Sequence, residues 1–228
     1  MIKFENVSVT YPGGVEALKD LNLEIKDGDF IIIVGLSGAG KSTLLRTVNN
    51  LVKPSTGSVY LEDKNVTSAK KRELKQIRSQ IGMIFQTFNL VNRSTVLKNV
   101  LTGRLSNIST FRSILGLWPK EQKQMAFEAL NQVEILEKAY VRASNLSGGQ
   151  QQRVGIARAL SQKPKVMLAD EPVASLDPIT SRVVMSYLKK INTELGITTI
   201  VNLHFLDLAK EFGDRLIGLR DGKLVFDG

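Results

Sequence analysis

The chain has 228 residues, of which 43% are hydrophobic and 23% are charged, as in folded domains with a sizeable core. It has no cysteine, which excludes disulfides and thiolate metal sites. No apolar run approaches the roughly 18 residues of a membrane span, and Glu5 and Asn6 stand where a secretion signal would be apolar. We therefore expect a cytoplasmic protein, or one held at a membrane by a partner.

The formal net charge is +9, which permits contact with nucleic acid or with anionic lipid. A basic cluster is formed by Lys64, Lys70, Lys71, Arg72, Lys75 and Arg78. Lys71, Lys75 and Arg78 recur at helical spacing around Leu74 and Ile77, so we favour a solvated helix face over a binding site here.

Alternating apolar residues predict two strands at the start of the chain, within 2–9 and 21–25. The turn Pro12-Gly13-Gly14 separates them, so an antiparallel hairpin over the next strand is expected. Tyr11 ends the first of these strands. Taken alone, it serves equally well as a core or turn residue and as an aromatic contact for a ligand.

The stretch from Gly35 to Thr43 fits the phosphate-loop pattern G-x-x-x-x-G-K-[ST]. It follows the apolar run 30–34 and precedes a helical segment over 42–51, the strand–loop–helix context that the motif requires. Glycines allow the backbone to wrap phosphate oxygens, while the loop amides and the helix dipole face the anion. Lys41 can reach the β- and γ-phosphates and Ser42 can offer its hydroxyl to Mg²⁺. We favour a nucleotide site over a plain strand–helix turn.

In the middle of the chain the predicted secondary structure changes from mixed strands and helices to helices alone. A strand is predicted over 58–62, a basic helix over 68–79 and a strand over 81–85 that ends at Gln86. Residues from about 90 to 160 contain no convincing strand, and Pro119 suits the first position of a helix. This stretch is interpreted as a helical insertion within an α/β domain.

The apolar run 166–169 predicts the next strand, which is followed by Asp170-Glu171. Asp177-Pro178 gives an N-cap and a first-turn proline for a following helix. A β-branched run over 197–203 then ends at His204, the only histidine of the chain. The segments 216–219 and 224–226, joined by a turn at 221–222, predict a closing hairpin.

Two further features point to nucleotide chemistry. Asp170 can meet Mg²⁺ beside the phosphate loop, and Glu171 suits a base for an attacking water, although such a pair can also serve as a structural cap. The run Leu146–Gln150 is a second glycine-rich turn before a helix expected from Gln150. It can be a simple N-cap by Ser147. One γ-phosphate does not obviously need two phosphate-type helix N-termini from the same molecule.

With these motifs in order, the sequence resembles the ATP-binding-cassette ATPases over essentially the whole chain, because Leu146-Ser147-Gly148-Gly149-Gln150 looks like the signature of that family. The resemblance implies an α/β fold: a P-loop NTPase (RecA-like) core with an N-terminal antiparallel β subdomain and an inserted α-helical subdomain. It implies one domain over 1–228, with 1–86 and 161–228 as the nucleotide-binding part and 87–160 as the helical subdomain that carries the signature.

The resemblance also implies residue roles, with ATP and Mg²⁺ as cofactors. Tyr11 would stack on adenine, Gln86 would sense the metal and the water, Asp177 would signal across a dimer and His204 would contact the γ-phosphate. The catalytic residues would be Lys41, Gln86, Glu171 and His204, and the metal ligands Ser42, Gln86 and Asp170. The nucleotide contacts would come from Tyr11, Gly35, Ser37, Gly38, Ala39, Gly40, Lys41, Ser42, Thr43, Ser147, Gly148, Gly149, Gln150 and Asp177.

In this family two copies pack head to tail, so Ser147, Gly148 and Gly149 of one chain would close the site of the other. The resemblance implies a homodimer at the cytoplasmic face of the cell membrane, bound peripherally to membrane permease subunits and served by a substrate-binding protein. Residues 88–97, after Gln86, are expected to line a groove for a permease helix through apolar Phe88, Leu90, Val91, Val96 and Leu97. The alternative is that all five pack within the insertion's own core, and we expect this of some of them.

Several short segments resemble the corresponding segments of phosphonate-importer ATPases: Asn89–Arg93, Pro172–Ser175 and Asn202-Leu203-His204. The last of these departs from the more usual threonine-histidine-aspartate. Three alternatives stay open: another importer or exporter class, a non-transport cassette acting on nucleic acid or ribosomes, and a binding module without turnover. The intact Glu171 and His204 argue against the last, and we do not expect nucleic acid as a partner. The cargo, whether phosphonate, phosphate or phosphite, is not fixed by the sequence.

Overall fold

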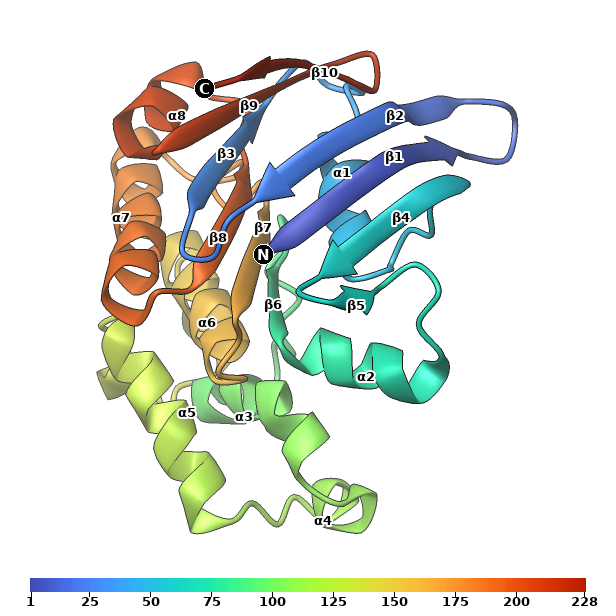
Figure 1. Cartoon of the computed structure of the whole chain (residues 1–228). Helices are drawn as coiled ribbons and strands as arrows, with labels where there is room; N and C mark the ends of the chain where they lie inside the picture. The colour runs from blue at the N-terminus through green and yellow to red at the C-terminus, as the bar shows by residue number, and fades with distance from the viewer.

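The computed structural model describes all 228 residues and contains two sheets (Figure 1). The larger has the strand order β10-β9-β3-β8-β7-β6 and is parallel except for the β9–β10 hairpin. Its strands are β3 (Phe30–Val34), β6 (Ile81–Ile84), β7 (Val166–Asp170), β8 (Thr198–Asn202), β9 (Arg215–Arg220) and β10 (Lys223–Asp227). The carboxyl ends of β3, β6, β7 and β8 therefore share one edge, where open α/β sheets bind ligands.

The smaller sheet is antiparallel and has the order β2-β1-β4-β5. It consists of β1 (Ile2–Thr10), β2 (Glu16–Ile25), β4 (Thr56–Leu61) and β5 (Lys64–Asn65). In Figure 1 it lies to the right of the larger sheet, with α1 behind it. The N-terminal hairpin predicted from the alternation of apolar residues is confirmed, and so is the closing hairpin.

Helices fill the rest of the chain. Four accompany the sheets: α1 (Lys41–Val48), α2 (Lys71–Ser79), α7 (Pro178–Leu195) and α8 (Leu206–Phe212). Between β6 and β7 the chain forms only helices, apart from one isolated bridge between Thr95 and Arg142. These are α3 (Val96–Leu101), η1 (Thr102–Asn107), α4 (Thr110–Ile114), α5 (Lys120–Gln132), η2 (Leu136–Lys138), η3 (Ala143–Asn145) and α6 (Gly148–Leu160). Figure 1 shows α3, α4 and α5 at the lower end of the molecule, away from the β10 end.

Two apolar cores lie on the two faces of the larger sheet. Successive residues of β3 alternate between them: Phe30 and Ile32 belong to the core shared with the helical insertion, whereas Ile31 and Ile33 pack toward α1 and the antiparallel sheet. A strand buried on both faces has the continuous apolar run expected of a central parallel strand. This packing fixes the position of β3, and with it the loop that follows.

Several predicted boundaries were wrong by a few residues. Pro119 has extended backbone (φ −57°, ψ 150°) and is the N-cap of α5 rather than its first residue. Helix α6 begins at Gly148, before the expected Gln150, because the Ser147 side chain caps it. Helix α2 begins at Lys71 instead of 68, and α1 ends at Val48, before 51. No helix of the structure is both long and apolar enough to cross a membrane.

Candidate functional site

The phosphate loop turns sharply between β3 and α1, and glycine is required where it does so. Gly40, the N-cap of α1, has φ of 101°, and a Cβ there would lie 2.3 Å from the carbonyl oxygen of Ala17. Any other residue would be strained and would collide with the β2 backbone. The close approach brings the antiparallel sheet against the start of α1.

Lys41 is 4% exposed and lies over the loop. Its Nζ donates to the carbonyl oxygens of Gly35 (2.8 Å) and Leu36 (3.0 Å). Burial lowers the pKa of Lys41, while the carboxylates of Glu171 and Asp170 oppose that shift. The ammonium group is thus held inside the loop that a phosphate would fill.

Asp170, at the end of β7, is 3% exposed and accepts three hydrogen bonds. Its Oδ1 accepts from Ser42 Oγ (2.7 Å) and from Asn202 Nδ2 (3.0 Å), and its Oδ2 accepts from Arg46 (2.9 Å). A buried carboxylate needs such partners to remain charged. The three donors come from α1 and from β8, so Asp170 joins the phosphate loop to the neighbouring strand.

Glu171 and His204 meet directly, with 2.6 Å between Glu171 Oε1 and His204 Nε2. Nδ1 of the same ring makes a longer contact of 3.5 Å with Lys41 Nζ. A carboxylate only accepts hydrogen bonds, so His204 Nε2 is the donor in its contact with Glu171. Glu171 has φ of 52°, the left-handed region that is unfavourable for a residue with a Cβ. Backbone strain of this kind is concentrated at functional sites.

Tyr11 lies beside the same loop. Its hydroxyl is 3.2 Å from Thr43 Oγ1, and 38% of the residue is exposed. The ring is therefore tied to the start of α1 while part of its surface is open to solvent. That combination permits stacking on a planar base.

The predicted signature forms a second cluster. The Ser147 side chain accepts from the amide of Gln150, whose own side chain accepts from the Ser147 amide, a reciprocal capping box. A Cβ on Gly149 would lie 2.3 Å from Thr180 Cγ2, so glycine lets the N-termini of α6 and α7 approach closely. Asp177 caps α7 through the amides of Ile179 and Thr180.

The predicted site residues thus fall into separate groups. The structure links Lys41 through His204 to Glu171, and joins Ser42 to Asp170 directly beside them in the chain. With Tyr11, which is hydrogen-bonded to Thr43, we call these residues the phosphate-loop network. Ser147, Gly149 and Gln150 instead line a pocket with residues of α7, and none of the phosphate-loop residues lines it. Within one chain, the two phosphate-type helix N-termini are therefore separate.

Gln86 is exposed and lies two residues beyond Ile84, which pairs with Ala169 of β7. It therefore emerges next to Asp170 at the same sheet edge. The segment that follows is bound to α6, because Arg158 donates to the carbonyl oxygens of Asn89 (2.6 Å) and Phe88 (3.0 Å). Burial lowers the pKa of Arg158, which has no carboxylate partner.

Of the residues 88–97 that were expected to line a permease groove, only Asn89 lines the hollow found in this region. A hollow of about 390 Å³ lies between the α/β part and the helical insertion, with Phe85, Asn89, Leu105 and Arg158 among its lining residues. Val96 and Leu97 were assigned wrongly, because they are 0% and 8% exposed and pack inside the insertion. Leu90 is only partly buried there and Val91 is 56% exposed.

Three residues that make the contacts described above, Arg46, Asn202 and Arg158, were not predicted as site residues from the sequence. Arg46 lies four residues after Ser42, so both side chains share one face of α1, and that spacing was a usable signal. Asn202 pairs with Asp170 in register across β7 and β8. Arg158 binds only main-chain carbonyls, which have no residue-type signature, so no sequence signal could have identified it.

The residues at Asp170 fit a magnesium ion. Mg²⁺ takes oxygen ligands and is usually bound through one or two carboxylates together with phosphates. Here Ser42 Oγ and Asp170 Oδ1 lie 2.7 Å apart at the phosphate loop. The buried Oδ1 of Asn202, whose Nδ2 binds Asp170, has no hydrogen-bond partner. Such an acceptor suits a metal-bound water. The chain has no cluster of three or more acidic or histidine ligands for a metal bound by protein alone.

Comparison with known proteins agrees with this geometry. The family model described as ABC transporter matches residues 18–174. The chain is 58% identical to "Phosphonates import ATP-binding protein PhnC 3" of Halalkalibacterium halodurans and 59% identical to "Phosphonates import ATP-binding protein PhnC" of Bacillus thuringiensis subsp. konkukian. Both alignments span 100% of this chain, with 88% and 89% of the respective relatives.

Solved structures agree as well. A dimeric bacterial ABC transporter cassette, MJ0796, matches with a TM-score of 0.87 and 39% identity over 100% of this chain and 98% of that one. The same cassette has been solved as a dimer in a post-hydrolysis state bound to ADP and Pi. The cassette cbiO1 of Clostridium perfringens gives a TM-score of 0.88 at 31% identity, over 100% of this chain and 87% of that one. The predicted P-loop fold is confirmed, and the chain belongs to the ABC transporter family as one of its ATP-binding cassette ATPases.

Proposed function

We propose that this chain is the ATP-hydrolysing subunit of an importer and that it energises uptake of a phosphonate, or a related phosphorus oxyanion, across the cytoplasmic membrane. The observation that carries the enzymatic part is the 2.6 Å contact between Glu171 and His204 beside Lys41 and Asp170. The printed names of the relatives support the cargo, because full-length matches at 58–59% identity are named for phosphonate import.

Each side chain in the network has a role in this proposal. Lys41 holds the β- and γ-phosphates, and Asp170 with Ser42 and Gln86 holds Mg²⁺, which neutralises charge on the phosphates when bound. Glu171 orients a water and accepts its proton, which is general-base catalysis. His204 keeps Glu171 in place through Nε2 and faces the γ-phosphate.

The separate signature cluster supports action as a pair. Ser147, Gly148 and Gly149 present a helix N-terminus that no phosphate loop of the same chain reaches, so we place it against the nucleotide of a second copy. The dimeric structures of the related cassette MJ0796 support the same arrangement. Asp177, at the start of α7, would then lie near the contact between the copies.

Coupling to the membrane would run through the helical subdomain, taken as residues 87–160. Gln86 follows β6, whose Ile84 pairs with Ala169 just before Asp170, and Arg158 binds the segment after Gln86 to α6. A change of nucleotide at the sheet edge can thus displace the wall of the groove at Phe85 and Asn89. We propose that this groove receives a short helix of a permease subunit.

The test of transport is reconstitution. The chain, its permease and a substrate-binding protein placed in vesicles should take up a phosphonate only with ATP, and not with Glu171→Gln. Uptake of a different solute class with no phosphonate uptake would overturn the cargo assignment while leaving the ATPase intact. Permease subunits that do not retain the chain during purification would overturn the transport role.

A further inference from the structure

One part of the helical insertion contains no buried residue. Helix α4 has five residues and none of them is buried, and no residue between Leu105 and Pro119 is buried either. An isolated helix of this length is not stable in water by itself. We call residues 105–120 the α4 tip. In Figure 1 it lies at the lower extreme of the molecule, beyond α3.

The α4 tip is apolar. Phe111 is 72% exposed and Ile114 79%, and they lie three residues apart on one face of α4. Leu115 and Leu117 follow at 54% and 57% exposed, and Leu105, 45% exposed, also lines the groove proposed for the permease. Leu105 therefore belongs both to that groove and to the tip. Contiguous exposed apolar residues of this kind mark an interaction site.

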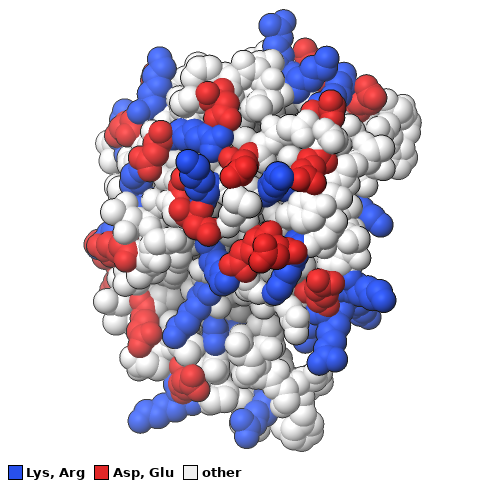
Figure 2. All heavy atoms as spheres, in the orientation of Figure 1, with Lys and Arg blue, Asp and Glu red and all other residues white.

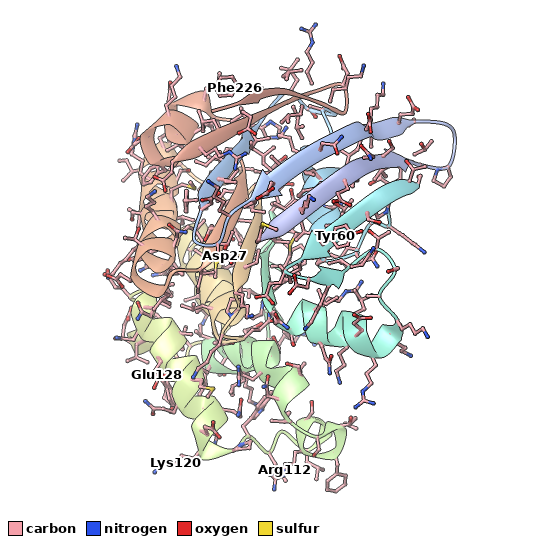
Figure 3. All side chains as sticks on the ribbon, viewed as in Figure 1. Asp27, Tyr60, Arg112, Lys120, Glu128 and Phe226 are labelled. Atoms are coloured by element: carbon pink, nitrogen blue, oxygen red, sulfur yellow. The ribbon has the colours of Figure 1, made fainter.

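The charge of the surrounding segment favours an anionic partner. Residues 74–120 carry no Asp or Glu, so all 22 acidic residues of the chain lie elsewhere. The same segment supplies seven of the formal net charge of +9, through Lys75, Arg78, Arg93, Lys98, Arg104, Arg112 and Lys120. All of these except Arg104 are exposed. Figure 3 places Arg112 and Lys120 at the lower edge with their side chains directed away from the body, and Figure 2 shows basic groups at that edge.

We propose that the α4 tip is a lipid-contact site that inserts Phe111 and Ile114 into the interface of an anionic bilayer, with Arg112 and Lys120 on the headgroups. Aromatic and aliphatic side chains next to Lys and Arg are the pattern of interfacial segments. A permease loop is the less favoured partner, because cytoplasmic loops of membrane proteins carry excess Lys and Arg and would repel this segment. The inference rests on the proposed function only for bringing the tip near a membrane.

A native tryptophan can report on this contact by its fluorescence. Trp118, the only tryptophan, lies within the tip and is partly buried against the insertion core. Its fluorescence therefore reports from the proposed site and from nowhere else. Vesicles whose acyl chains carry bromine quench a tryptophan only when it approaches the hydrocarbon.

The experiment compares flotation of the full chain with phosphatidylcholine vesicles that contain phosphatidylglycerol and with phosphatidylcholine alone. The wild type should float with the anionic vesicles, show quenching of Trp118 by brominated lipid and lose binding at high salt. Arg112→Gln with Lys120→Gln should lower the partition coefficient about 25-fold, or about fivefold for each basic residue. Phe111→Ser with Ile114→Ser should lower it about tenfold or more.

Two matched pairs serve as controls. Lys71→Gln with Arg72→Gln on α2 removes the same charge elsewhere, and Val225→Ser with Phe226→Ser removes two exposed apolar side chains of β10 at the opposite end of the molecule. Both should bind nearly as the wild type does. Equal losses in tip and control variants, equal binding to neutral vesicles, or no quenching of Trp118 would overturn the proposal. So would cross-links from residue 114 to a permease subunit without any vesicle binding. The assay needs no nucleotide, so its failure would leave the transport role untouched.

Discussion

The guanidinium of Arg158 joins α6 to Asn89, since it donates to the carbonyl oxygen of Asn89 at 2.6 Å. Helix α6 begins at the signature residues Gly148 and Gly149, and Asn89 lies three residues after Gln86. One side chain therefore connects the segment that follows Gln86 to the helix that would face a second copy.

This relationship predicts that Arg158→Ala keeps ATP binding but uncouples hydrolysis from the permease. Two main-chain carbonyls lose a charged donor, and hydrogen bonds to charged groups contribute about 1.5–3 kcal/mol each, so the free energy of unfolding should also fall. Amide hydrogen exchange of residues 86–97, measured with and without ATP, tests specifically whether this segment responds to nucleotide. In the variant these amides should no longer respond to nucleotide, whereas Arg158→Lys should retain part of the response. An unchanged nucleotide response in Arg158→Ala would show that the link is only structural.

The contact between Gly149 and Thr180 predicts a compensating pair of substitutions. Gly149→Ala should lower the midpoint of thermal unfolding and reduce hydrolysis, because its Cβ would lie 2.3 Å from Thr180 Cγ2. Thr180→Ser removes that methyl group and should restore much of both properties in the double variant. If the double variant is as impaired as Gly149→Ala, the loss comes from a source other than this steric contact.

The capping role of Asp177 predicts a pH-dependent contribution to stability. Hydrogen bonds from the α7 N-terminus, chiefly at Thr180, lower the pKa of Asp177 below its ordinary value of 3.8. A carboxylate with a lowered pKa contributes stability that is present above the unfolded-state pKa and is lost as pH falls through the folded-state value. Chemical unfolding of the wild type and Asp177→Asn should therefore differ at neutral pH, and the difference should shrink as pH falls below 3.8. A difference that is constant with pH would contradict this assignment.

The separation of the two clusters predicts complementation between chains. Ser147→Arg and Lys41→Ala should each abolish hydrolysis alone. In a mixed dimer both defects fall in one site, so the other site is intact and a fraction of activity should return. The measurement is hydrolysis in mixtures in which mixed dimers have been shown to form. Mixed dimers without recovered activity would contradict a site shared between copies.

Much of the site was predictable because the motifs follow strand ends. Asp170 and His204 come directly after or at the end of apolar runs, and carboxyl ends of parallel strands share one edge of a sheet, so their meeting with Lys41 follows from sequence and topology. The direct bond between His204 and Glu171 could not be predicted. It depends on how the two side chains are placed at the sheet edge, which no residue pattern signals.

Other features depended on tertiary packing. Val96 and Leu97 have the same apolar character as the exposed Val91, and only the fold decides which of them faces the core. Helix α8 was not predicted, because its seven residues give little periodicity.

The most direct test of hydrolysis at this site is the steady-state rate of Glu171→Gln with its affinity for ATP measured on the same preparation. Glu171 adjoins Asp170, the proposed metal ligand, but makes none of the contacts expected to bind the triphosphate. The account predicts unchanged ATP affinity, a rate reduced by about 10²–10⁴-fold, as for loss of a general base, and a dimer that persists with ATP. A rate within a fewfold of the wild type would contradict it.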